Sequence, residues 1–218
     1  MVDAGQPTTV TAWVWGGGLL IASALLPLVA SASLNEVGNL AIVGGIGIAA
    51  FSAALLLFAY GWRSQGSVVA RRPLGTTALT VWAAVGPLSA VISLALPAYD
   101  AGSAPLFEAL YYGELLVWLG AGLVSVVAIA RAGVVPRPWN RAPLWAFGIV
   151  VGAGVLFQAA IVGVADRPDG QEALGLLMGI LSLVSTLVPL LLGILAIVLG
   201  LRSAPRPVVQ VYPPEPPA

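Results

Sequence analysis

The sequence predicts an all-α fold, a polytopic membrane helical bundle with six transmembrane helices arranged as three hairpins. Two observations lead to this fold class. Apolar residues make up 59% of the 218-residue chain and charged residues only 8%, whereas soluble domains carry about 25% charged residues. The apolar residues also occur in stretches of about 20, the length that a helix needs to cross a bilayer. The lipid bilayer is therefore the first expected partner.

The six apolar stretches account for most of the chain, and short polar loops separate them. Residues 1–11 form a short N-terminus, and residues 12–201 form the six-span bundle. Residues 202–218 form a proline-rich tail whose composition predicts disorder or polyproline II structure, with a docking peptide around Tyr212 as the alternative. The predicted spans are Ala12–Ser33, Leu40–Tyr60, Thr76–Pro97, Leu110–Ala130, Leu144–Val164 and Ala173–Leu201.

The arginines predict how the chain is threaded through the membrane. Short loops that carry arginine stay in the cytoplasm, and eight of the nine arginines fall on one side of the predicted spans. Both termini should therefore be cytoplasmic, as an even number of spans also requires, and the expected location is the plasma membrane. Aromatic rings favour the membrane interface, and the tryptophans expected near the cytoplasmic one are Trp13, Trp15, Trp62, Trp82, Trp139 and Trp145.

Two features of this threading have alternative interpretations. Ala30, Ser31 and Ala32 resemble a signal-peptide cleavage site, but the segment before the first span contains Asp3 and no positive charge. The three hairpins resemble repeats of a two-helix unit, because a glutamate precedes and an arginine follows each even span. The topology rules predict the same pattern without duplication. The inverted repeat of many secondary transporters is not visible.

Three residue types are missing from the chain, and their absence excludes several kinds of chemistry. Without cysteine, histidine and lysine, the chain lacks disulfides, Cys/His metal sites, Ser-His and Cys-His pairs and lysine Schiff bases. The acidic loop from Asp166 to Glu172 is too short for an EF-hand. We therefore expect no catalytic residue, no metal, no cofactor, no nucleic-acid partner and no enzymatic activity. The arginine-only composition suggests a bacterial source.

Glu114 is the best candidate for a functional residue, because a charge at the centre of a bilayer costs about 2.5–3.5 kcal/mol. Tyr111 and Trp118 lie three residues before it and four residues after it, on one face of the fourth span. Gln158 in the fifth span is expected at a similar depth, so these four residues form the predicted ligand-binding site. The alternative is a solvated interfacial glutamate, with hydrogen bonds between helices at the other positions. Further hydroxyl groups for such a pocket come from Ser182, Ser185 and Thr186.

Small residues predict where helices pack. GxxxG pairs occur at Gly148 and Gly152 and at Gly175 and Gly179, and such pairs let helix backbones approach closely. They predict contacts within the bundle, with a membrane protein partner or with a second copy in a homo-oligomer. Prolines inside a span usually kink its helix, and they occur at Pro27, Pro87 and Pro189.

Two functions from different classes fit this sequence. The first is a non-enzymatic accessory or scaffold subunit of a membrane complex, because no catalytic site is recognisable. The second is a small-molecule transporter or a substrate-binding membrane subunit, with an outer-leaflet polar pocket around Glu114 and Gln158. The size and the six-span layout are similar to those of the S-components of energy-coupling-factor vitamin transporters. This resemblance covers architecture and no motif, and it implies a substrate-binding subunit. An intramembrane enzyme is the least favoured function, since only one carboxylate lies inside a span.

Overall fold

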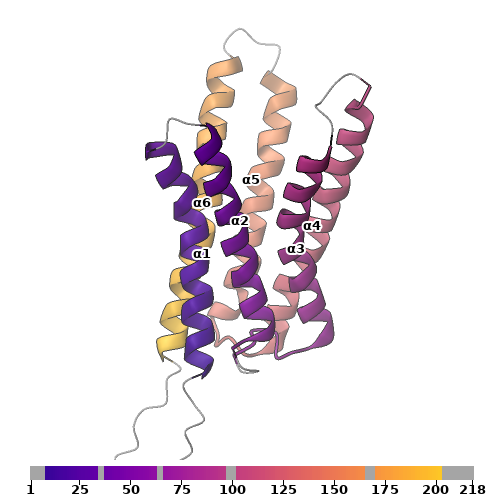
Figure 1. The fold of residues 1–218 in the computed structure, drawn as a ribbon. Helices are drawn as coiled ribbons and strands as arrows, with labels where there is room; N and C mark the ends of the chain where they lie inside the picture. The colour runs from indigo at the N-terminus through magenta and orange to yellow at the C-terminus, as the bar shows by residue number, and fades with distance from the viewer. Residues whose placement is uncertain (1–7, 34–36, 63–65, 97–101, 165–169, 203–218) are drawn as a thin grey trace, which may run out of the picture.

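The computed structural model is all-helical and confirms the predicted fold class. It describes residues 8–33, 37–62, 66–96, 102–164 and 170–202. Six of its helices are long and apolar enough to cross a membrane, and they stand side by side in one bundle (Figure 1). The elements are α1 (Thr8–Ser33), α2 (Val37–Tyr60), α3 (Pro73–Ala95), α4 (Ala104–Ala132), the 3-10 helix η1 (Trp139–Arg141), α5 (Ala142–Val164) and α6 (Gly170–Arg202). The first residues of the chain, the proline-rich tail and the acidic loop residues 165–169 lie outside the described residues.

Several helices extend beyond the apolar stretches from which they were predicted. The reason is that capping residues and backbone geometry, and not hydropathy, set where a helix begins and ends. α3 begins at Pro73, ahead of the predicted Thr76, since proline suits the first turn, where its missing N–H is not needed. α4 begins at Ala104, ahead of the predicted Leu110. It ends at Ala132 and is capped by Gly133, whose φ of 71° is a left-handed conformation that glycine adopts at little cost.

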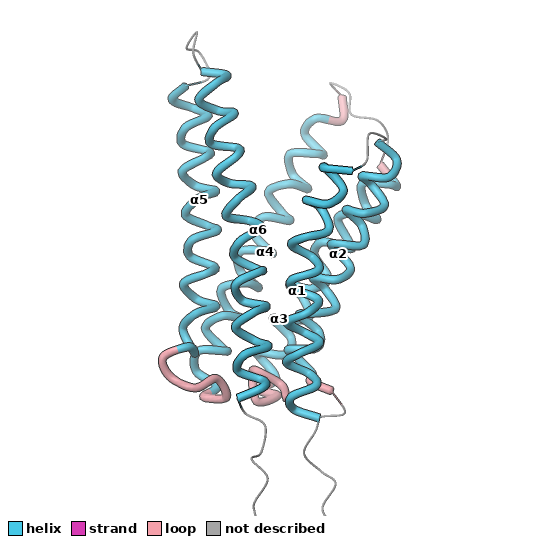
Figure 2. The backbone as a smooth tube through the Cα atoms, turned by 90° about the vertical axis from the view of Figure 1, so that its left-hand side faces the viewer, coloured by secondary structure: helices cyan, strands magenta, loops and turns pink. Residues whose placement is uncertain are grey.

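The six helices form a closed ring in chain order. Each helix contacts its neighbours in the sequence, and α6 returns to contact α1. Within the described residues, the backbones of helices that are not neighbours in the ring do not approach each other closely, and the joint between α4 and α5 is the least extensive. Figure 2 shows α5 and α6 diverging from α1 and α2 toward the end far from the two termini. The centre of the ring therefore contains no helix.

One end of the ring, here called the basic end, is closed by its loops. The indole Nε1 of Trp13 donates a hydrogen bond of 3.0 Å to the carbonyl of Gly66, which ties the start of α1 to the loop after α2. Val69 of the same loop is fully buried in a core that α1, α2, α3, α4 and α6 share. The arginines that the structure describes lie at this end, in the loops and the last helical turns: Arg71, Arg72, Arg131, Arg137, Arg141 and Arg202.

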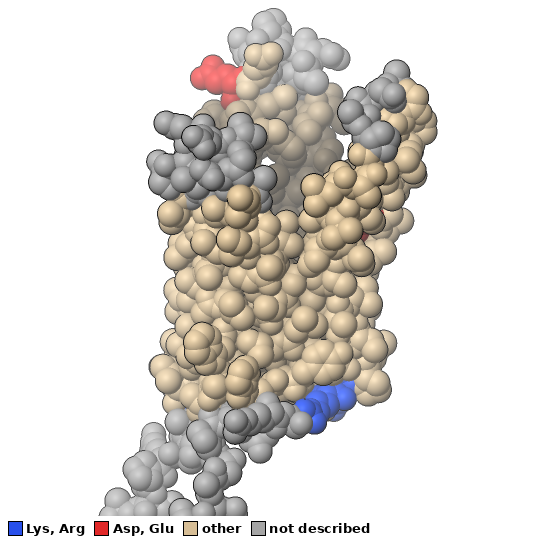
Figure 3. Space-filling model, in the orientation of Figure 1, with Lys and Arg blue, Asp and Glu red and all other residues tan. Residues whose placement is uncertain are grey.

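The opposite end, here called the acidic end, carries glutamates near the starts of two helices. Glu108 lies close to the start of α4, and Glu172 lies in the first turn of α6. On the face that Figure 3 shows, basic side chains appear at the lower end, acidic ones at the upper end, and the belt between them is almost entirely uncharged. The charges of the described residues thus separate along the bundle axis, as expected of a protein that crosses a membrane.

Candidate ligand-binding cavity

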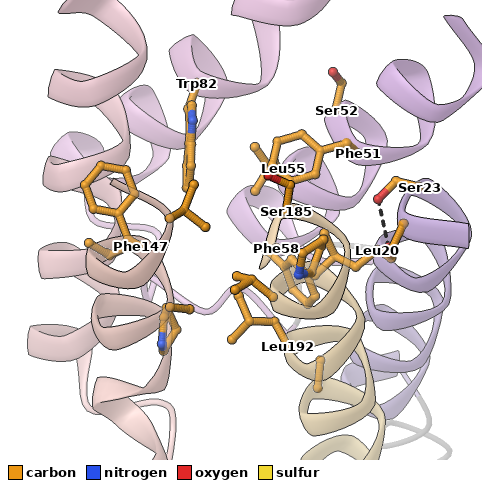
Figure 4. Close-up of a pocket in the computed structure, with 18 of the residues that line it drawn as sticks. Leu20, Ser23, Phe51, Ser52, Leu55, Phe58, Trp82, Phe147, Ser185 and Leu192 are labelled. Atoms are coloured by element: carbon orange, nitrogen blue, oxygen red, sulfur yellow. Dashed lines mark hydrogen bonds between the residues drawn. The ribbon is translucent and has the colours of Figure 1, made fainter. Parts of the chain in front are cut away.

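A cavity of about 680 Å³ occupies the centre of the ring. All six helices contribute to its wall, and Val68, Val135 and Trp139 contribute at the basic end. Figure 3 shows the molecule hollowed between its helices toward the acidic end. In Figure 4, Trp82 and Phe147 stand across the space from Leu55 and its neighbours. The volume lies within the range of about 300–1,000 Å³ that small-molecule sites occupy.

Four aromatic rings from four helices, here called the aromatic cluster, form part of the cavity wall: Phe51, Trp82, Trp118 and Phe147. Trp82 lies at its centre and packs edge-to-face on the other three, with ring centroids 5.8–6.1 Å apart. Trp118 and Phe147 are stacked, with centroids 5.5 Å apart. Aromatic pairs at such distances contribute about 0.5–1.5 kcal/mol beyond the area they bury. Because Trp118 belongs to α4 and Phe147 to α5, the cluster stabilises the least extensive joint of the ring.

A few polar groups interrupt this mainly apolar wall. The indole Nε1 of Trp82 is buried and has no hydrogen-bond partner, and such an unsatisfied donor costs about 1–3 kcal/mol. The hydroxyl of Ser23 donates to the carbonyl of Leu20 at 2.8 Å, the dashed line in Figure 4. Ser52 and Ser185 also line the cavity.

Two of the three intramembrane prolines lie in the cavity wall. Pro27 of α1 and Pro189 of α6 line the cavity, whereas Pro87 of α3 does not. A proline has no N–H, so the carbonyl four residues before it loses its usual helical donor. These carbonyls belong to Ser23 and Ser185, which also line the cavity. The prolines therefore leave these two carbonyls without their usual helical donors.

Glu114 is the one charged residue among the described residues that line the cavity. The hydroxyl of Ser89 donates to its Oε2 atom. Glu114 lies about 15 Å along α4 from Ala104, at 1.5 Å per residue. A carboxylate accepts about four hydrogen bonds, so most of its acceptor capacity is open to a ligand.

The structure brings together some of the residues predicted for the site and separates others. Glu114 and Trp118 line the cavity, whereas Tyr111 and Gln158 do not. The side chains of Tyr111, Gln158 and Glu114 are all exposed, and Tyr111 packs on Tyr112 with centroids 5.4 Å apart. Val150 is the last residue of α5 in the wall, and beyond it the helix diverges from the bundle, so Gln158 is carried away. The predicted hydroxyl residues of α6 do lie in the wall, at Ser182, Ser185 and Thr186.

The GxxxG pairs predicted to pack helices face open space within the chain. A Cβ atom added at Gly148, Gly152, Gly175 or Gly179 would meet no atom within 4 Å. Contacts within the bundle therefore do not use these glycines, and their predicted contact with a partner or a second copy stays a prediction. Close helix packing occurs instead at glycines that the motif does not mark, among them Gly17, Gly122 and Gly193.

Trp82 differs from its expected position at the cytoplasmic interface. It lies about 14 Å along α3 from Pro73, at the centre of the aromatic cluster. Sequence reasoning also missed Phe51 and Phe147 as wall residues. Their helices are apolar on all sides, and such helices carry no hydrophobic periodicity that tells the inner face from the outer one. The only available signal was the position of Trp82, well after the predicted start of its span.

No metal-binding arrangement occurs in the part of the chain that the structure describes, where no three or more His, Cys, Asp or Glu residues form a group. The wall instead offers aromatic surface, a few hydrogen-bonding groups and one carboxylate, which suit noncovalent binding. No family model matches the chain, and no curated protein and no solved structure matches it. The functional proposal therefore comes from the cavity itself.

Proposed function

We propose that this membrane protein binds a largely apolar small molecule in its central cavity, either as a transporter or as a substrate-binding membrane subunit. The observation that supports this proposal is the cavity of about 680 Å³ between the six helices. Protein interiors are normally close-packed, and an empty space of this size would forfeit the dispersion contacts of all its lining atoms. A bound molecule restores those contacts.

The asymmetry of the bundle supports a direction of access. Buried loop residues such as Val69 close the basic end, while α5 and α6 diverge at the acidic end (Figure 2). A ligand would therefore enter from the acidic end or through the weak joint between α4 and α5. Trp118 and Phe147 bridge that joint by stacking. These two rings would therefore have to move apart when a ligand passes between α4 and α5.

The threading follows from the same asymmetry. Arginine-bearing loops are retained in the cytoplasm, so we infer that the basic end faces the cytoplasm and that both termini lie there. The acidic end and the mouth of the cavity then face outward. The arginine-only composition supports a bacterial plasma membrane as the location. In this role the protein is not an enzyme.

A pair of variants on α5 tests the proposed function. Val150 lines the cavity, whereas Val155 has 62% of its surface exposed. The probe is N-phenyl-1-naphthylamine, added to the full chain in lipid nanodiscs, with the signal of empty nanodiscs subtracted. Val150→Trp should weaken its saturable binding at least about tenfold by filling the site, and Val155→Trp should not. Equal binding by both variants, or no saturable binding by the native chain, contradicts the proposal.

The second candidate function, an accessory or scaffold subunit, is favoured by one observation. Gly175 and Gly179 leave a strip of α6 open to an approaching helix, and small residues favour such contacts in membranes. In this role, Gly175→Leu with Gly179→Leu should abolish cross-linking to a partner in the native membrane and leave the unfolding temperature unchanged. Gly18→Leu, another site with nothing within 4 Å, is the matched control. Unchanged cross-linking in the double variant would remove the support for this role.

A further inference from the structure

We propose that the molecule bound in the cavity is an organic cation, whose charge lies between the carboxylate of Glu114 and the aromatic cluster. This inference rests on the proposed binding function and names the class of its ligand. Glu114 and the four rings of the cluster all line the same cavity. An apolar body would fill the rest of the space, toward Leu55 and Leu192 (Figure 4).

The charge balance of the cavity is the first reason. Glu114 is its only charged residue among those described, and no arginine is part of the wall. The chain contains no lysine and no histidine, and the described arginines lie at the basic end. Charged residues within a membrane normally have a partner of opposite sign. A cationic ligand would supply the partner that the wall does not provide.

The position of the aromatic rings is the second reason. Trp118 follows Glu114 by one helical turn on α4, and residues at this spacing are neighbours on a helix surface. Its centroid lies 5.9 Å from that of Trp82. The faces of aromatic rings attract cations that come within about 6 Å of the centroid, and tryptophan does so most strongly. The wall of this one cavity therefore contains both a carboxylate and electron-rich aromatic rings.

The remaining polar groups select further features of the ligand. Hydroxyl groups in the wall, at Ser52, Ser182 and Ser185, can accept hydrogen bonds from a primary or secondary ammonium group. An anionic ligand would meet the carboxylate of Glu114 with no basic side chain in the wall to offset the repulsion. The wall thus favours an amphiphilic amine over a fatty acid or an organic phosphate.

Two ions of nearly equal size and opposite charge, tetraphenylphosphonium and tetraphenylborate, test the inference. The full chain is held in nanodiscs of zwitterionic lipid, and cavity binding is the difference between native chain and Val150→Trp. Tetraphenylphosphonium should bind the cavity and tetraphenylborate should not. Glu114→Gln should weaken tetraphenylphosphonium about tenfold, while Glu108→Gln, on the same helix but outside the cavity, should have no effect.

The outcomes separate this inference from the proposed function. If both ions bind, and Val150→Trp removes both while Glu114→Gln changes neither, the cation inference is wrong and the cavity still binds ligands. If neither ion nor N-phenyl-1-naphthylamine binds, both proposals are wrong. Should Glu114→Gln fail to fold, Trp118→Leu serves instead. It should weaken tetraphenylphosphonium more than the neutral probe, and an equal loss of both contradicts the role of the rings.

Discussion

Gly17 of α1 and Gly193 of α6 bring the backbones of the first and last helices into direct contact. A Cβ atom added to Gly17 would lie 2.5 Å from the carbonyl oxygen of Gly193, and one added to Gly193 would lie 2.6 Å from the carbonyl oxygen of Gly17. No side chain fits between the two helices at this point. Their contact closes the ring around the cavity.

Replacing Gly17 should therefore destabilise the bundle. We expect Gly17→Val to lower the free energy of unfolding by about 1–3 kcal/mol, the usual cost of overpacking, because backbone atoms of α6 cannot rotate away as a side chain can. Gly18→Val is the matched control, since nothing lies within 4 Å of its added carbon. Thermal unfolding in one detergent measures both. An equal midpoint for the two variants would show that α1 and α6 do not touch there.

Gly122 has no side chain, and the Phe147 ring of the aromatic cluster occupies the space beside it. A Cβ atom added there would lie 2.5 Å from Cε2 of Phe147, so Gly122→Ala should push that ring out of its stack on Trp118. We expect a changed near-ultraviolet circular dichroism spectrum and a loss of about 1 kcal/mol of stability. Gly120→Ala, on the same helix with open space beside it, should keep the native spectrum. Identical spectra for both variants would contradict the stacked arrangement.

The hydrogen bond from Trp13 to Gly66 should help to close the basic end. Trp13→Phe keeps an aromatic ring and removes the donor, so we expect a loss of about 0.5–1.5 kcal/mol and faster amide hydrogen exchange in residues 66–72. Trp15→Phe is the comparison, because the Trp15 ring is 60% exposed. If exchange in this loop responds equally to the two changes, the hydrogen bond does not hold it.

Single cysteines test the threading, because the native chain has none. Gly102 and Val134 are both exposed, the first beside the start of α4 and the second just after its end. A membrane-impermeant maleimide added to intact cells should label Gly102→Cys and should label Val134→Cys only after lysis. The reverse pattern would place the basic end outside, and labelling of both in intact cells would contradict the six-span arrangement.

The sequence predicts the membrane-spanning helices well, because hydropathy and length decide which segments cross a bilayer. It also places Glu114 and Trp118 on one face, because helical spacing alone requires it. The rotation of the other helices was not predictable. The GxxxG motif marks Gly175 and not Gly17, yet Gly17 touches a backbone and Gly175 faces open space. Only the packing of whole helices decides this difference, and it also carries Gln158 away from the cavity.

Native mass spectrometry of the full chain, released gently from its own membrane, would show whether the central cavity holds a ligand. The cavity predicts that the chain carries a bound small molecule with a mass that fits the volume of about 680 Å³. The same molecule should be absent from Val150→Trp and present on Val155→Trp. Ligand binding in the central cavity would be contradicted if the native chain left its membrane without any small molecule. It would also be contradicted if Val150→Trp carried the same bound molecule as the native chain.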